Sequence, residues 1–180
     1  MANQGNFWVN VLNEPKRKNR FSLTLGDLPS WSIKALNKPT FNINVIEHDY
    51  LDYKFKFPGR VTWDAITVTV VDPAMADNEN SAKLYQYLSD AGWVAPDSTA
   101  GAESAKMITK ARATKLPGAT SQQYAIITQM DADGKNLEAW TLYNAFITKV
   151  NFGALEYSSD DLVEVALDLA YDYAKYETFV

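Results

Sequence analysis

The sequence predicts a mainly β protein, an antiparallel two-sheet sandwich or barrel with one packed α-helix. Three observations predict it: repeated alternation of apolar and polar residues, one stretch with helical spacing, and no regular strand–helix–strand repeat. The length suits one domain with a proper core, so we treat residues 1–180 as a single domain. Within it we distinguish an N-terminal arm, residues 1–20, and a long interaction loop, residues 95–120.

The clearest alternation runs from Leu162 to Tyr173. A period of two held over this length indicates a strand with one buried face. The predicted core face carries Val163, Val165, Leu167, Leu169, Tyr171 and Tyr173. The predicted outer face carries Glu164, Ala166, Asp168, Ala170 and Asp172.

Shorter strands are predicted elsewhere from the same alternation and from β-branched and aromatic composition. The first contains Phe21, Leu23 and Leu25, and the next contains Tyr53, Phe55 and Phe57 before a predicted turn at Pro58-Gly59. A central strand is predicted over 61–71. Two more, over 124–130 and 140–152, flank a predicted hairpin turn at Asp133-Gly134.

One helix is predicted between the strands. Asp77 or Asn78 is placed to cap it, and Gly92 is placed to end it. The residues at helical spacing are Leu84, Tyr85, Leu88 and Ala91.

The two remaining segments do not have the pattern of a core. Residues 1–20 are polar and end in a basic run, and residues 95–120 are rich in small residues between Gly and Pro. Loops this long in a compact domain are usually functional or disordered, so we expect both segments to become ordered against a neighbour. The basic run is Lys16, Arg17, Lys18 and Arg20.

Composition excludes several classes of function. The chain has no cysteine and a single histidine, His48, which excludes disulfides, thiolate nucleophiles and the usual zinc sites. A net charge of −5 opposes binding to nucleic acid. No apolar run approaches the roughly 18 residues of a membrane helix, and the start lacks the order of a signal peptide. We therefore expect a soluble protein made in the cytoplasm, without cofactor, metal or membrane partner.

Two motifs resemble chemical sites and are better explained as surface turns. Glu47-His48-Asp49 groups a base with carboxylates, but neighbouring strand residues point to opposite faces and no nucleophile elbow accompanies them. Asp131-x-Asp133-Gly134 begins like a calcium loop, but the position that needs Glu holds Leu142. We expect a solvated turn and a hairpin tip.

Two further groups of charges are also assigned to surfaces. Glu164, Asp168 and Asp172 stand about 13 Å apart at each four-residue step of a strand, too far for a glycosidase pair. The basic run is interpreted as a solvated arm. No catalytic, cofactor-binding or metal-binding residue is predicted, and the protein is not expected to be an enzyme.

The order of these elements resembles a known family. The elements follow one another in this order: the stretch TWDAITVTVVD at 62–72, the helix around 83–91, the long polar loop, the hairpin around Asp133-Gly134, the turn at 152–155 and a closing strand over 163–171. Together with the segment KALNKP at 34–39, this order is similar to that of tail-tube proteins of contractile-tailed (myovirus) phages, over roughly residues 20–173. The fold is shared with type VI secretion tube proteins.

The resemblance implies a structural virion protein. Hexameric rings would stack into the inner tail tube, which conducts DNA during ejection. The tube would be assembled in the host cytoplasm. The implied partners are other copies, the sheath, baseplate and tail terminator proteins, and the tape measure protein and DNA, which pass through the lumen without tight binding. We expect hairpins near 41–71 and 124–152 to share a ring-wide barrel, with polar positions at Thr62, Asp64, Thr67, Thr69, Thr128, Asn144 and Thr148.

Other functions remain open at this point. The nearest alternatives share the fold: a tube protein of a type VI secretion or other contractile injection system, or a baseplate tube initiator. A non-enzymatic β-barrel binding module for single strands would need surface aromatics along a basic groove. We instead expect Trp31, Trp63 and Trp140 to lie in the core.

Overall fold

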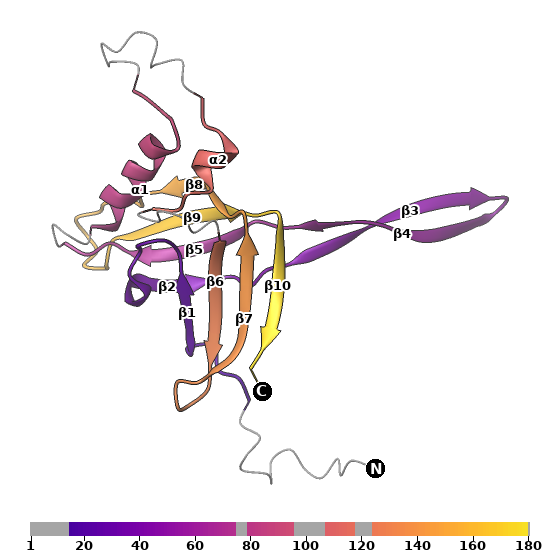
Figure 1. Cartoon of the computed structure of the whole chain (residues 1–180), viewed down its shortest axis with the longest axis horizontal. Helices are drawn as coiled ribbons and strands as arrows, with labels where there is room; N and C mark the ends of the chain where they lie inside the picture. The colour runs from indigo at the N-terminus through magenta and orange to yellow at the C-terminus, as the bar shows by residue number, and fades with distance from the viewer. Residues whose placement is uncertain (1–14, 75–78, 96–106, 118–123, 180) are drawn as a thin grey trace.

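The computed structural model describes residues 15–74, 79–95, 107–117 and 124–179. Its strands form two four-stranded antiparallel sheets and one separate hairpin (Figure 1). The first sheet has the order β1 (Phe21–Thr24), β6 (Tyr124–Met130), β7 (Asn136–Tyr143) and β10 (Tyr173–Thr178). The second has the order β2 (Ile33–Leu36), β5 (Ile66–Val71), β9 (Glu164–Ala170) and β8 (Phe146–Asn151). The hairpin pairs β3 (Phe41–Tyr50) with β4 (Tyr53–Trp63). The predicted mainly β, antiparallel class is confirmed.

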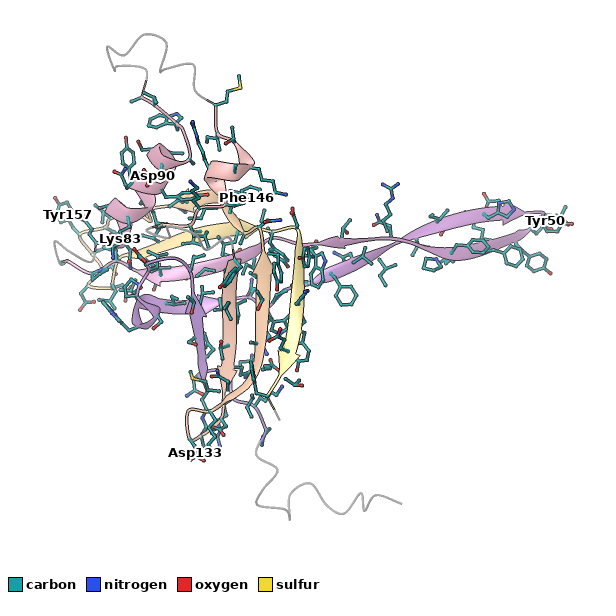
Figure 2. The ribbon with its side chains drawn as sticks, in the orientation of Figure 1. Tyr50, Lys83, Asp90, Asp133, Phe146 and Tyr157 are labelled. Carbon is teal, nitrogen blue, oxygen red and sulfur yellow. The ribbon has the colours of Figure 1, made fainter. Side chains whose placement is uncertain are left out.

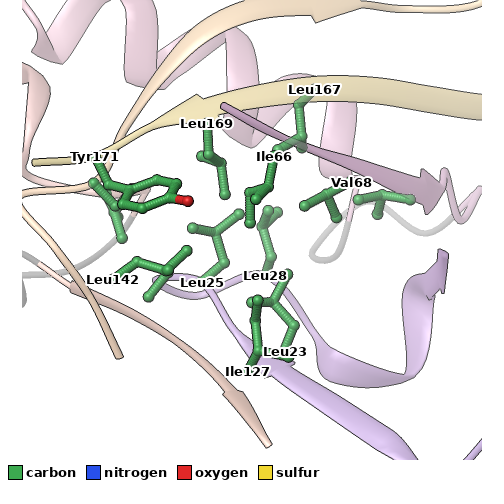
Figure 3. Packing of buried hydrophobic residues seen from close by; sticks show 14 of the residues in the cluster. Leu23, Leu25, Leu28, Ile66, Val68, Ile127, Leu142, Leu167, Leu169 and Tyr171 are labelled. Atoms are coloured by element: carbon green, nitrogen blue, oxygen red, sulfur yellow. The ribbon is translucent and has the colours of Figure 1, made fainter. Parts of the chain in front are cut away.

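The core lies between the two four-stranded sheets, whose strands run across one another (Figures 1 and 3). Alternate residues of β5 and β9 enter it from one sheet, and alternate residues of β1 and β6 enter it from the other. The buried members of the predicted closing strand are Val165, Leu167, Leu169 and Tyr171. The alternation thus identified the central part of the core correctly.

The predicted strand over 162–173 is nevertheless divided. β9 ends at Ala170, the chain turns a corner at Tyr171-Asp172, and β10 begins at Tyr173 in the other sheet. Val163 precedes β9 and Tyr173 follows the corner, and both are about 40% exposed. Their assignment to the core was wrong, because the alternation of residue types begins before β9 does and continues through the corner at which the chain changes sheets.

Two other predicted strands are also interrupted. The run over 61–71 breaks at Asp64-Ala65, so that its first part belongs to β4 and the rest to β5. The run over 140–152 breaks near Asn144, which has a positive φ of 54°. The predicted turn at Pro58-Gly59 is wrong, since β4 passes straight through it with only a register shift.

The turn at Asp133-Gly134 is confirmed as a hairpin tip between β6 and β7. The Asp131 carboxylate accepts hydrogen bonds from the backbone N–H of Asp133 (2.9 Å) and of Lys135 (2.8 Å). Gly134 has a φ of 79°, a conformation that favours glycine.

Helix α1 (Asn80–Asp90) is present, and of its predicted core positions Leu84 and Ala91 are buried and Leu88 is half-buried. The Asp72 carboxylate, at the end of β5, accepts hydrogen bonds from the backbone N–H of Asn80 (2.9 Å) and Ser81 (3.2 Å). Such bonds satisfy donors that a helix leaves free at its first turn. Asp77 and Asn78 lie outside the described residues.

The buried face of α1 carries Leu84 and Tyr87, whereas Tyr85 is 57% exposed. Tyr85 was therefore assigned to the wrong face, although it directly follows Leu84, which packs in the core. The helix ends as predicted before Gly92, whose φ is 111°.

Part of the predicted interaction loop belongs to the core. Within residues 107–117 the chain forms the short helix α2 (Lys110–Ala113), and Ala113, Thr114 and Leu116 are buried. A Cβ on Gly26, at φ 57°, would come within 2.2 Å of the Pro117 carbonyl oxygen, so this segment closes directly over the end of β1. Residues 96–106 and 118–120 lie outside the described part.

Candidate assembly surfaces

The β3–β4 hairpin projects from the body as a long arm (Figure 1). All ten residues of β3 are exposed, as are most of β4. Ten large apolar side chains of the arm are between 49% and 83% exposed: Phe41, Ile43, Val45, Ile46, Tyr50, Leu51, Tyr53, Phe55, Phe57 and Val61. This is the largest concentration of exposed apolar residues in the part of the chain that the structure describes.

Such an arm is not expected to be stable when nothing covers it. A two-stranded hairpin is marginal in water, and three or more strands or a packed partner are needed for independent stability. Among the described residues, β3 and β4 pair only with each other, so each also leaves one edge of its backbone unpaired. Exposed edges and apolar side chains both favour association with another chain.

Charged residues occupy part of the arm as well. Glu47 lies 3.6 Å from the Lys54 ammonium and 4.0 Å from that of Lys56, and Asp49 lies 3.9 Å from Lys54. Glu47-His48-Asp49 is therefore strand rather than the predicted solvated turn. Its carboxylates form exposed ion pairs across the hairpin.

A buried ionic cluster holds the base of the arm to the first sheet. Glu138 in β7 is only 4% exposed and binds Lys16, which precedes β1, and Lys38, which leads from β2 into the arm. The Tyr176 hydroxyl donates to it over 3.0 Å. Burial by itself would raise the pKa of Glu138, but the hydrogen bonds from Lys16, Lys38 and Tyr176 outweigh it and lower the pKa to about 2.

The basic run at 16–20 is exposed up to Asn19, as the sequence suggested, but its first two residues are held to the first sheet. Lys16 is bound to Glu138, and the backbone carbonyl of Arg17 accepts a hydrogen bond from Gln129 (3.1 Å). Residues 1–14 lie outside the described part of the chain. Lys38 and Glu138 were missed by sequence reasoning, because a single charge within a strand gives no sign of burial.

A second exposed surface follows β8, at the opposite end of the molecule from the arm's tip. Tyr50 and Tyr157 mark the two ends in Figure 2. Leu155, Tyr157 and Leu162 are each more than 70% exposed, beside a hollow of about 960 Å³ that Lys34 also lines. The predicted turn at 152–155 is confirmed: the Asn151 side chain accepts from the Gly153 N–H (3.1 Å), and Gly153 has a φ of 84°.

The three acidic residues of the closing strand have separate partners. Glu164 binds Lys34, and Asp168 accepts a hydrogen bond from Thr67 (2.8 Å). Asp172 accepts from Lys110 (2.6 Å) and from Asn144 (2.7 Å), and these bonds, the one from Lys110 most, lower its pKa. They do not converge on one site.

The polar residues proposed for the shared barrel lie in different environments. Thr62, Asp64 and Thr67 are exposed, Thr69 and Thr128 are half-buried, and Asn144 lies in the turn before β8. Thr148 is exposed and donates to the Asp168 backbone carbonyl (3.1 Å).

The shared barrel stays a prediction, and the second hairpin would join it from inside the first sheet. β6 and β7 are flanked within the chain by β1 and β10, so pairing with another copy would use those two outer strands. The edges of the two large sheets are β1, β10, β2 and β8.

Two of the three tryptophans behave as predicted. Trp63 and Trp140 pack against the core while remaining partly exposed. Trp31 is 65% exposed, so its assignment to the core was wrong. It lies in a single 3-10 turn, η1 (Ser30–Ser32), rather than in a strand.

The described residues contain neither a group of three potential metal ligands nor a helix with the length and apolar character of a membrane span. Exposed apolar and edge surfaces are thus the features that need explanation.

Comparison with known proteins identifies the family of the chain. The family model described as T4-like virus tail tube protein gp19 matches residues 17–175. The chain belongs to this family. Tail-tube proteins are structural components and not enzymes, as predicted.

Solved structures share the fold with this tail-tube protein. The anti-feeding prophage cap, described as a tube-terminating cap, is 19% identical, with a TM-score of 0.66 over 99% of both chains. A chain from the PVC sheath-tube complex of an extracellular contractile injection system, in its extended state, is 17% identical, with a TM-score of 0.63 over 93% of this chain and 94% of that one. Comparison with curated protein sequences gives no significant match.

Proposed function

We propose that this tail-tube protein forms hexameric rings that stack into the inner tail tube of a contractile-tailed phage. The contractile sheath encloses this tube, and phage DNA leaves through it during ejection. The observation that carries the proposal is the β3–β4 arm, whose apolar side chains and backbone edges are left uncovered by the described residues of one copy.

Other copies of the chain are the partners that suit the arm. A head-to-tail interface repeated around an axis closes into a ring, and repeated along the axis gives a tube. Each copy offers an arm at one end and the exposed 152–163 segment at the other (Figure 2). The net charge of −5 supports passage of DNA without tight binding, because phosphates are repelled.

The remaining partners are proposed from the family and from the related assemblies. They are the sheath, baseplate and tail terminator proteins, with the tape measure protein passing through the lumen. The whole chain, residues 1–180, would act as one tube domain of the virion.

A second candidate shares the tube but not the particle. The similar solved structures come from the anti-feeding prophage and from an extracellular contractile injection system, so the tube of a contractile injection system other than a phage tail is the alternative function. Identification of the nucleic acid or protein inside purified particles separates the two.

A shortened arm tests the proposal. Ile46 and Phe57 pair across the hairpin, so residues 47–56 can be replaced by an Asn-Gly turn without changing the rest of the ladder. None of the removed residues belongs to the core cluster, so we expect a folded subunit that unfolds cooperatively at nearly the parent's melting temperature. Sedimentation should show tubes for the parent protein and none for the variant. Normal tubes from the shortened chain would refute the role of the arm.

A further inference from the structure

The apolar residues of the arm change from one local face of the hairpin to the other halfway along it. Residues directly opposite each other in a ladder lie on the same face. Near the body, one face carries the pairs Phe41–Trp63, Ile43–Val61 and Val45–Pro58. Towards the tip, that face carries the charged pairs Glu47–Lys56 and Asp49–Lys54, and the apolar pairs Ile46–Phe57 and Tyr50–Tyr53 lie with His48–Phe55 on the opposite face.

The sequences of both strands produce this change of face at the same position along the hairpin. In β3, the adjacent residues Val45 and Ile46 are both apolar, which shifts the apolar positions by one. In β4, apolar residues keep strict alternation, but two residues, Gly59 and Arg60, lie opposite Asn44 alone. This β-bulge moves the following residues to the other face and increases the local twist.

Gly59 is adapted to the bulge by close approach of the backbone. A Cβ at this position would lie 2.9 Å from the Asn44 carbonyl oxygen, a distance that real Cβ atoms essentially never show. A larger residue would therefore have to displace β3. The change of face is thus built into both the sequence and the backbone of the arm.

The ribbon itself turns over at the same place. In Figure 1, β4 lies above β3 next to the body, the strands cross once midway, and β3 lies above β4 at the tip. When a ribbon turns over, its two faces exchange directions in space. The exchange of apolar residues between the two faces therefore cancels the turn, so the apolar residues near the body and those near the tip point in the same direction.

We infer that the arm presents one continuous apolar stripe, from body to tip, and that a second copy of this chain covers the stripe along its whole length. The stripe consists of Phe41, Ile43, Val45, Val61, Ile46, Phe57, Phe55, Tyr50 and Tyr53, with His48 beside Phe55. The far side carries Thr62 near the body and the ion-paired Lys54 near the tip, and it faces solvent. This inference rests on the proposed tube.

A second copy is the appropriate occupant because the chain belongs to the tail-tube family and its arm has no partner among the described residues of one copy. The charged residues of the tip already pair across the hairpin and leave the stripe free of charge. An apolar, uncharged surface of this kind fits a packed protein interface.

The absence of cysteine allows a direct test. Four single-cysteine variants of β4 form two neighbouring pairs: Val61→Cys and Thr62→Cys near the body, and Phe55→Cys and Lys54→Cys near the tip. Reaction with a maleimide is measured in dissociated subunits and in tubes assembled from the purified chain alone. All four thiols should react in subunits, because each replaced side chain is exposed.

In tubes, the thiols at 61 and 55 should react at least about tenfold more slowly, whereas those at 62 and 54 should change by less than about twofold. If a stripe cysteine blocks assembly and its neighbour does not, the result also supports the inference.

If the thiols at 61 and 54 are the slow ones in tubes, the apolar face near the body and the apolar face near the tip point to opposite sides of the arm. If all four thiols react at equal rates in tubes, neither side of the arm is covered. Either result overturns the inference while leaving the tube in place. Failure of the unsubstituted chain to assemble would instead refute the proposed function.

Discussion

Glu138→Gln should destabilise the subunit at neutral pH, although glutamine has nearly the same shape. The Glu138 carboxylate is buried and accepts hydrogen bonds from Lys16, Lys38 and Tyr176. A fall of its pKa from the ordinary 4.5 to about 2 on folding corresponds to roughly 3 kcal/mol at neutral pH. Because both lysines remain about half exposed and are screened by water, we expect a loss of about 2 kcal/mol.

The pH dependence of this loss follows from the direction of the shift. The folded-state pKa of Glu138 lies below the unfolded one, so its stabilising effect is fully present above about pH 4.5 and is lost as the pH falls through about 2. The difference in unfolding free energy between the parent protein and Glu138→Gln should therefore shrink across this window.

Urea denaturation between pH 7 and pH 2.5 measures this difference. Glu177→Gln is the matched control, because Glu177 is exposed on the neighbouring strand β10. The reasoning would be refuted if Glu138→Gln cost no more than the control at pH 7, or if its cost did not change on acidification.

Three further substitutions test the core, the helix cap and the contact between helices. Leu167→Ala should lower the unfolding free energy by about 2–5 kcal/mol in urea denaturation, because Leu167 is 1% exposed between the sheets. An effect below about 0.5 kcal/mol would contradict this core, and Leu162→Ala, at an exposed position, is the control. Tyr87→Phe should lower the unfolding free energy by about 1–3 kcal/mol in the same assay, because the Tyr87 hydroxyl donates to the Ala113 carbonyl (2.6 Å) and accepts from the Ile147 N–H (3.2 Å). A loss no larger than that of Tyr85→Phe, at an exposed position, would contradict a stabilising role of these bonds. Asp72→Ala should remove the cap of α1 and cost about 1 kcal/mol in thermal unfolding, and an unchanged melting temperature would show that the cap contributes nothing.

Alternation predicted the strands well where one face is buried and the other is not. It located the core residues of β9, whose buried positions recur at every second residue, and it also placed Leu23 and Leu25 in the core. It did not detect the corner at Tyr171-Asp172, where the same alternation continues while the chain passes into another sheet.

The turn of the arm could not be predicted from residue types. Pro58-Gly59 has the composition of a turn and forms a bulge, whereas the chain reverses at Leu51-Asp52. Leu51 adopts a φ of 53°, which leucine rarely does, and its side chain is 83% exposed. Similarly, the burial of Glu138 depends on Lys16 and Lys38, which are distant in sequence and give no local signal.

Electron microscopy of the purified chain tests the central claim most directly. The account predicts rings with sixfold symmetry that stack into hollow tubes of uniform width, with the β3–β4 arm of each copy packed against another copy. A protein that remains monomeric at all concentrations, or that forms only irregular aggregates, would contradict it.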